Sequence, residues 1–298
     1  MPDKNLESEI ITVGIFKCGN IASSPLFELL LDELADRKDI KTRTVSIGSK
    51  MGVEDVEAAL PKIFDFKPDL IVLISPNPSI RGPAVAREKF SDSGVPGIVV
   101  CDAPGKRAMP ELEEEGLGYI IITGDPLIGA RREFLDPIEM AIFNSNIIKV
   151  LAITGVYRII HQEIDRLIHI LKTKSKLVLP RLVIDAGVIR ERSDFSNPYA
   201  KAKALAAYEL AEKVADINLQ ACFREKESSK YIPLVASAHE VAQLAARLAE
   251  EAREIEKYGD TLVRRPHSKK GALKIKTKLM HPPNVDESFH QKSSDNKE

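Results

Sequence analysis

The feature that most constrains the fold is an alternation of short apolar runs with helical patterns over the first 125 residues. Five apolar runs predict strands: Ile10–Phe16, Thr42–Ile47, Leu70–Ile74, Gly97–Cys101 and Tyr119–Thr123. The segments between them predict helices: Pro25–Arg37, Val53–Phe64, Pro83–Ser91 and Met109–Glu115. Short apolar strands separated by helices are typical of a parallel sheet with both faces covered. We therefore predict an α/β fold with a Rossmann-like parallel sheet in residues 1–125.

The pattern after Thr123 is mainly helical, which predicts a helical region over residues 126–258. "DP" at Asp136 and "NP" at Asn197 each place a capping residue before a proline, so both predict helix starts. Pro233 predicts a third helix start, and "VLPRLVID" fits a short strand. Residues 259–283 predict a small β hairpin with a Lys-Lys-Gly turn, and the polar residues 284–298 predict a disordered tail.

Composition restricts the class of protein and its location. The chain has 43 Lys plus Arg against 44 Asp plus Glu, which argues against nucleic-acid binding through bulk positive charge. Its three cysteines form no CxxC pair, so they fit a reducing compartment and predict no zinc site. No apolar run reaches the ~20 residues that span a bilayer, and the charged N-terminus is unlike a signal peptide. We expect a soluble cytoplasmic protein without a membrane or nucleic-acid partner.

Polar turns follow three of the predicted strands, with the sequences "KCGN", "SPNP" and "CDAPG". Ligands of open parallel sheets bind beyond the carboxyl ends of the strands, so these loops predict a binding crevice. The first loop lacks the G-x-G-x-x-G fingerprint, and the second strand ends in "SIGSK" without a carboxylate for an adenosine ribose. A nicotinamide dinucleotide is therefore disfavoured. The loop glycine, the serines and the helix N-terminus near Pro25 favour an anionic or carbonyl-rich ligand without adenine.

Signatures of other common catalytic sites are missing from the sequence. There is no Walker lysine motif, no G-x-S-x-G elbow and no H-E-x-x-H, and Cys18 has no histidine near it in sequence. Two charged groups remain as candidates. The first, Arg131-Arg132-Glu133, fits either a clamp on an acidic or amide-bearing substrate or a solvated cluster at a subunit contact. The second, His239-Glu240, lies in a predicted helix, where a histidine is more often structural, although neighbouring alanines leave room for a ligand.

Long stretches of the sequence resemble one enzyme family. They include "GPAVARE", "EEGLGYIIITGDPLIGARREFLDPIEMAIFN", "IKVLAITGVYR", "FSNPYAKAKALAAYELAEKVADI", "YIPLVASAHE" and "RPHSKKG", together with the three loops. In these segments, from about Ile10 to Pro282, the chain resembles the coenzyme F420-dependent methylenetetrahydromethanopterin dehydrogenases of methanogenic and related archaea. The stretch from Glu115 to Asn144 is the most specific of them.

The resemblance implies a reversible hydride transfer from methylenetetrahydromethanopterin to the oxidised deazaflavin coenzyme F420. It implies a dissociable F420, no metal, no tightly bound prosthetic group, and assembly as a homo-oligomer, typically a hexamer built from dimers. Residues 1–125 would bind the deazaflavin, which carries no adenine. This agrees with the missing ribose carboxylate.

On this resemblance and on motif position, we assign candidate residues to each role. Those for the deazaflavin are Gly19, Asn20, Ser23, Ser75 and Asn77. Asp102 is the candidate catalytic residue, because its carboxylate could hydrogen-bond a ring N–H of either partner. Candidates for the pterin side or for a subunit interface are Arg131, Arg132, Glu133, His239 and Glu240.

Two other functions remain open on the sequence alone. One is a nicotinamide-dependent oxidoreductase on a doubly wound sheet, against which the ending of the second strand argues. The other is a non-catalytic, oligomeric ligand-binding protein that has kept the fold.

Overall fold

A six-stranded parallel sheet, ordered β2-β1-β3-β4-β5-β6, forms the centre of the computed structural model, which describes residues 10–31, 35–126, 134 and 136–286. The strands are β1 (Ile11–Lys17), β2 (Ile40–Ser46), β3 (Leu70–Ile74), β4 (Gly97–Asp102), β5 (Gly118–Ile122) and β6 (Arg181–Ile184). Every neighbouring pair is parallel, and the strand order reverses between β1 and β3. The predicted α/β fold with a parallel sheet is confirmed.

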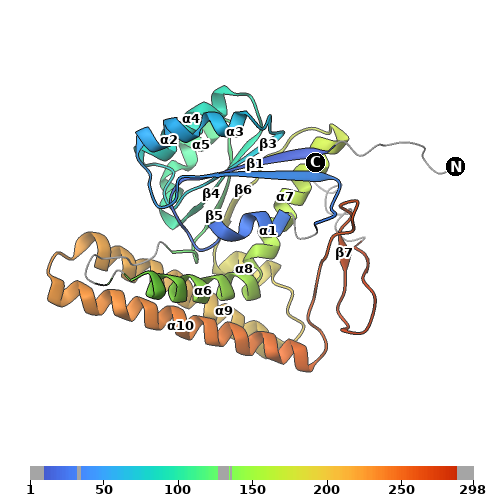
Figure 1. Cartoon of the computed structure of the whole chain (residues 1–298). Coiled ribbons are helices and arrows are strands. Elements are labelled where there is room, and N and C mark those ends of the chain that lie inside the picture. The colour runs from blue at the N-terminus through green and yellow to red at the C-terminus, as the bar shows by residue number, and fades with distance from the viewer. Residues whose placement is uncertain (1–9, 32–34, 127–133, 135, 287–298) are drawn as a thin grey trace.

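Helices cover both faces of the sheet, which explains why the central strands are continuous apolar runs. Residues of β3, β4 and β5 are all buried. One face carries α2 (Val53–Ala59), α3 (Pro61–Phe64), α4 (Arg81–Asp92), the 3-10 helix η2 (Ala103–Ala108) and α5 (Met109–Glu114). The other face carries the short helices η1 (Ser24–Leu26) and α1 (Phe27–Leu31) and the long α7 (Val156–Thr173) (Figure 1).

A layer of long helices lies below the sheet in Figure 1 and consists of α6 (Pro137–Thr154), α9 (Pro198–Leu219) and α10 (Ser228–Tyr258). The two predicted capped starts are confirmed, since Asp136 accepts from the backbone N–H groups of residues 138 and 139, and Asn197 from those of residues 199 and 200. Alanines allow α6, α9 and α10 to approach closely, and the buried ones include Ala207, Ala211, Ala245, Ala246 and Ala249. The short helices α8 (Ala186–Arg192) and η3 (Gln220–Arg224) complete this part.

The prediction that Pro233 opens a helix is wrong. Helix α10 already begins at Ser228, and the proline lies inside it. A proline at this position leaves the carbonyl of residue 229 without its helical donor. Ser229 and Pro233 are both exposed, so water can reach that carbonyl and the helix continues.

The sheet is completed by a strand from the region that was predicted to be helical. β6 comes from the segment "VLPRLVID" and pairs with β5 from Tyr119 to Ile122, while α7 packs on the sheet. Sheet and helices are therefore not separated along the chain at residue 125. This follows from the crossover rule, since a parallel strand must return through a long connection and here the connection contains α6 and α7.

The C-terminal segment forms a small antiparallel element. Isolated bridges join Arg264 to Lys276 and His267 to Leu273 across the Lys-Lys-Gly turn. Beyond them, β7 (Lys274–Ile275) pairs with β8 (Asn284–Val285). Pairing thus extends to the first residues of the predicted tail, and residues 287–298 lie outside the described part.

Among the described helices, none is by itself long and apolar enough to cross a membrane; α6 and α7, bent by 67° at their junction, reach that length and composition only together.

Candidate functional site

The loops after β1, β3 and β4 lie along one edge of the sheet because the strands are parallel. Backbone hydrogen bonds hold them there: Cys18 N–H donates to the Ile74 carbonyl (2.9 Å), and Ser75 N–H donates to the Val100 carbonyl (3.0 Å). The reversal of strand order falls between β1 and β3, where doubly wound sheets open their ligand crevice. The structure therefore brings the β1 and β3 loops, with Gly19 and Ser75, to the position expected for a ligand.

Position 19 requires glycine for two reasons, the backbone conformation and the lack of space for a side chain. Its φ is +86°, a left-handed conformation that favours glycine. A Cβ atom there would lie 2.8 Å from both Met51 Sδ and Pro76 Cδ. The loop after β1 can therefore pack against the loop after β3 only with glycine at this position.

The polar side chains of this edge differ in how they are used. Ser75 is fully buried, and within the described residues its hydroxyl has no hydrogen-bond partner. Asn77 accepts from Ser79 N–H (3.0 Å) and shapes its own turn, whereas Asn20 is exposed. Asp102, only 3% exposed, accepts from Ala103 N–H and caps η2. The Ser23 hydroxyl of the loop after β1 is likewise buried without a hydrogen-bond partner among the described residues, so two serine hydroxyls at this edge have unused hydrogen-bonding capacity.

Asp125 is a central residue of this edge that the sequence analysis left in an unassigned loop. Its carboxylate is fully buried and accepts from the backbone N–H groups of Ala22 (2.7 Å) and Ser23 (3.0 Å). Burial raises its pKa to about 6, because the hydrogen bonds from the Ser23 and Ala22 segment only partly offset the loss of hydration. The end of β5 therefore holds the loop after β1 in place. The "GDP" that follows the apolar β5 run was the available signal.

A second contact fastens α9 to the ends of β5 and β6. Tyr208 OH accepts from Gly124 N–H (3.1 Å) and donates to the Ile184 carbonyl (2.6 Å). Thr123 Oγ1 donates to the half-buried Glu212, whose pKa is raised by burial. The helical layer thereby presents a carboxylate to the same edge of the sheet as Asp125.

Cys18 lies in the β1 loop but cannot act as a ready nucleophile. It is fully buried, and burial, followed by the nearby Asp55 carboxylate, raises the thiol pKa to about 12. The thiolate is the reactive form of cysteine, so this group stays protonated near neutral pH. The site contributes shape and hydrogen bonds rather than a thiolate.

Comparison with known proteins decides the family. The family model described as methylene-5,6,7,8-tetrahydromethanopterin dehydrogenase matches residues 11–284. The chain belongs to this family. Relatives named F420-dependent methylenetetrahydromethanopterin dehydrogenase are 52% identical in Methanothermobacter thermautotrophicus and in Archaeoglobus fulgidus, each over 92% of this chain and 99% of the relative.

A solved structure of a family member shows the same fold. It is an F420-dependent methylene-tetrahydromethanopterin dehydrogenase in complex with methylene-tetrahydromethanopterin and coenzyme F420, 47% identical to this chain. The match has a TM-score of 0.88 and covers 92% of this chain and 100% of the other. The resemblance seen in the sequence is thereby confirmed.

Of the remaining candidates, His239 and Glu240 lie on α10 in the helical layer. His239 of α10 is packed between Phe134 and Phe143, each with its ring centroid 4.8 Å away, and its Nδ1 lies 3.9 Å from Glu139 Oε2. Glu240 is exposed. Arg131, Arg132 and Glu133 lie outside the described residues. Phe134 follows Glu133 directly, so its contact with His239 brings the described end of that loop to α10.

One cluster in the described chain has the composition of a metal site, but its hydrogen bonds argue against ligation. Donor atoms of His161, Asp165 and His267 lie within 4.8 Å of one another. Arg37 Nη1 lies 3.1 Å from His267 Nδ1, and a guanidinium can only donate, so Nδ1 must accept. His267 Nε2 then carries the proton and donates to Asp165 (2.8 Å). A metal at Nε2 would need an imidazolate, so the cluster serves as a hydrogen-bonded network.

Proposed function

We propose that this chain catalyses reversible hydride transfer from methylenetetrahydromethanopterin to oxidised coenzyme F420, giving methenyltetrahydromethanopterin and reduced F420. The observation that carries the proposal is 52% identity over 99% of a relative that bears this activity in its name. The carboxyl edge of the sheet agrees with it, because the loops after β1 and β3 meet there at the reversal of strand order and the buried Ser75 hydroxyl has no hydrogen-bond partner among the described residues.

The coenzyme supplies the hydride acceptor, so the protein's task is geometric. The crevice must hold two flat rings face to face at roughly 3–3.5 Å. It must also keep water from the methenyl product, which is an electrophile. The Asp125 carboxylate holds the loop after β1 by two backbone N–H groups, and this fixes the loop in position before ligands bind.

For the deazaflavin we assign Gly19, Asn20, Ser23, Ser75 and Asn77. The support is their place on the two loops at the reversal of strand order. Asp102, which caps η2 at the same edge, is assigned as the residue that would hydrogen-bond a ring N–H of either partner.

For the pterin side we assign Arg131, Arg132, Glu133, His239 and Glu240, supported by the contact between Phe134 and His239. We also propose a homo-oligomer, a hexamer in its final form, and a cytoplasmic location. Sedimentation of the purified protein would measure the oligomeric state, since the mass of a 33.0 kDa monomer is far below that of a hexamer.

The test mixes purified protein with methylenetetrahydromethanopterin and F420 and follows bleaching of the deazaflavin absorption band. Turnover with F420 and none with NAD or NADP is the expected result. Binding of both compounds without turnover would instead indicate a non-catalytic homologue. In the same assay Asp102→Ala should lower turnover, and unchanged turnover with unchanged affinities would remove Asp102 from the site.

A further inference from the structure

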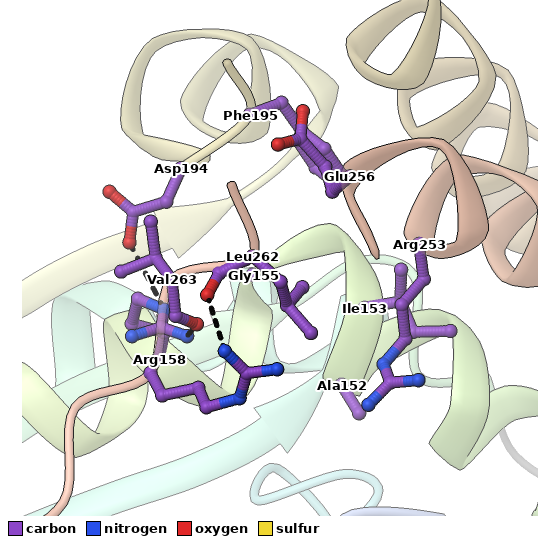
Figure 2. Close-up of a pocket in the computed structure, with 11 residues that line it drawn as sticks. Ala152, Ile153, Gly155, Arg158, Asp194, Phe195, Arg253, Glu256, Leu262 and Val263 are labelled. Carbon is purple, nitrogen blue, oxygen red and sulfur yellow. Dashed lines mark hydrogen bonds and ion pairs between the residues drawn. The ribbon is translucent and has the colours of Figure 1, made fainter. Parts of the chain in front are cut away.

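A cavity of about 400 Å³ lies away from the carboxyl-edge loops, at the junction of α6 and α7. Its walls come from that junction at Gly155, from the segment after α8, from α10, and from residues 262–264 (Figure 2). The volume is within the range of small-molecule sites in proteins. The loops assigned to the deazaflavin contribute none of its lining residues.

Three arginines from different segments line this cavity: Arg158 of α7, Arg253 of α10 and Arg264 of the C-terminal segment. Arg253 is exposed and has no hydrogen bond or ion pair with any described residue. Toward the part of the chain that the structure describes, the Arg264 side chain donates through Nη1 alone, to the carbonyls of Leu262 (3.0 Å) and Thr277 (3.3 Å). Several guanidinium N–H groups at the cavity thus remain available to a ligand.

The two carboxylates of the lining are already engaged. Asp194 pairs with Arg158 (3.1 Å) and with Arg265. Glu256 is buried and accepts from the backbone N–H groups of Ser196 (2.9 Å) and Asn197 (2.7 Å). Figure 2 shows the Glu256 carboxylate directed away from the Arg253 guanidinium. The charged side chains of the lining that remain for a ligand are therefore cationic.

Helix dipoles do not decide the sign of the site. The carboxyl end of α6 and the amino end of α7 meet at Gly155, so their partial charges oppose one another. The guanidinium groups decide it. Burial lowers the pKa of Arg158 despite its pairing with Asp194, so this cation has lost hydration that its partner only partly replaces.

We propose that the cavity binds a small, multiply charged oxyanion with a phosphate or carboxylate head group. Guanidinium groups hold such ions through paired, charge-assisted hydrogen bonds. A bound oxyanion would join Arg253 of α10 to Arg158 of α7 and Arg264, and so fasten the C-terminal segment to the helical layer.

The experiment titrates the full-length protein with inorganic phosphate, and separately with succinate, by calorimetry, and measures the thermal unfolding midpoint against sodium chloride at equal ionic strength. Binding of either oxyanion, with a rise in midpoint that chloride does not give, is expected because a ligand of the native state stabilises it. Phosphate binding alone would identify a phosphate head group, and succinate binding alone a carboxylate one.

Arg253→Ala should weaken that binding about tenfold, the loss of one bidentate contact. Arg253 is exposed on a helix, so alanine should leave the fold intact. Arg247→Ala is the matched control, because Arg247 is exposed on the same helix and does not line the cavity. The proposal is overturned if neither oxyanion binds, which would be the result if a second copy of the chain filled the cavity. It is also overturned if Arg253→Ala and Arg247→Ala change oxyanion binding to the same extent.

Discussion

The two ends of the parallel sheet both bury charged side chains, but they neutralise them differently. At the amino end, Asp39 is fully buried between Arg37 (2.8 Å) and Lys172, and Arg37 continues to His267 and Asp165. At the carboxyl end, Asp125 is equally buried, and among the described residues only hydrogen-bond donors without charge contact its carboxylate.

The pKa values follow this difference. Burial alone would raise the pKa of Asp39, but hydrogen bonds from Arg37 and Lys172 hold it below its ordinary value. The pKa of Asp125 is raised to about 6 because two backbone N–H groups cannot replace a cation. The amino end is built for stability, and the Gly271 turn packs directly on Asp39 there. The carboxyl end keeps an unneutralised carboxylate at the loop that we assign to the coenzyme.

The largest expected effect is at the amino end. Asp39→Ala should lower the free energy of unfolding by about 3–5 kcal/mol, because it leaves Arg37 and Lys172 without their buried partner. Urea unfolding measures it. Asp65→Ala is the control, since its pair with Lys62 is exposed and should contribute below about 1 kcal/mol. A loss no larger than the control's would mean that the buried network does not hold this end.

The second effect concerns pH and has opposite signs at the two ends. A folded pKa above the unfolded value of 3.8 means that the contribution of Asp125 to stability is present below pH 3.8 and is lost as the pH rises through about 6. The loss should approach ~3 kcal/mol. The pKa of Asp39 is lowered, so its contribution to stability is present at pH values above the unfolded pKa. That contribution is lost only as the pH falls further into acid.

Unfolding free energies measured between pH 4 and 7 test this difference. The wild-type curve should fall across that range, and the curve of Asp125→Asn should be flatter, because the amide does not titrate. Parallel curves for the two proteins would show that Asp125 is not the group responsible.

The smallest effect separates stability from binding at the carboxyl end. Ser75→Ala should raise the free energy of unfolding by about 1 kcal/mol, since it removes a buried hydroxyl that has no partner in the described structure. The same change should weaken F420 affinity about fivefold if that hydroxyl binds the coenzyme. Ser93→Ala is the control, because Ser93 donates to Phe90 and should only destabilise. Unchanged F420 affinity would remove Ser75 from the site.

Much of the carboxyl edge could be predicted because it depends on local pattern. Apolar runs located β1, β3, β4 and β5, and parallel strands must place the loops that follow them on one edge. The contacts that hold those loops could not be predicted in this way. Asp125 lies 103 residues from Ala22, and no periodicity connects them. The position of β6 in the sheet could not be predicted either, because a short apolar run does not indicate which strand it will pair with.

The sequence by itself determined the α/β class, the capped starts of α6 and α9, and the family, because these depend on spacing and on long stretches of matching residues. Only the tertiary structure decided which charges are neutralised. Lys172 meets Asp39 across 133 positions of the chain, and Arg265 meets Asp194 across 71. Such contacts depend on how the helices and the C-terminal segment fold onto the sheet. Burial then determines how far each contact shifts the pKa of the groups involved.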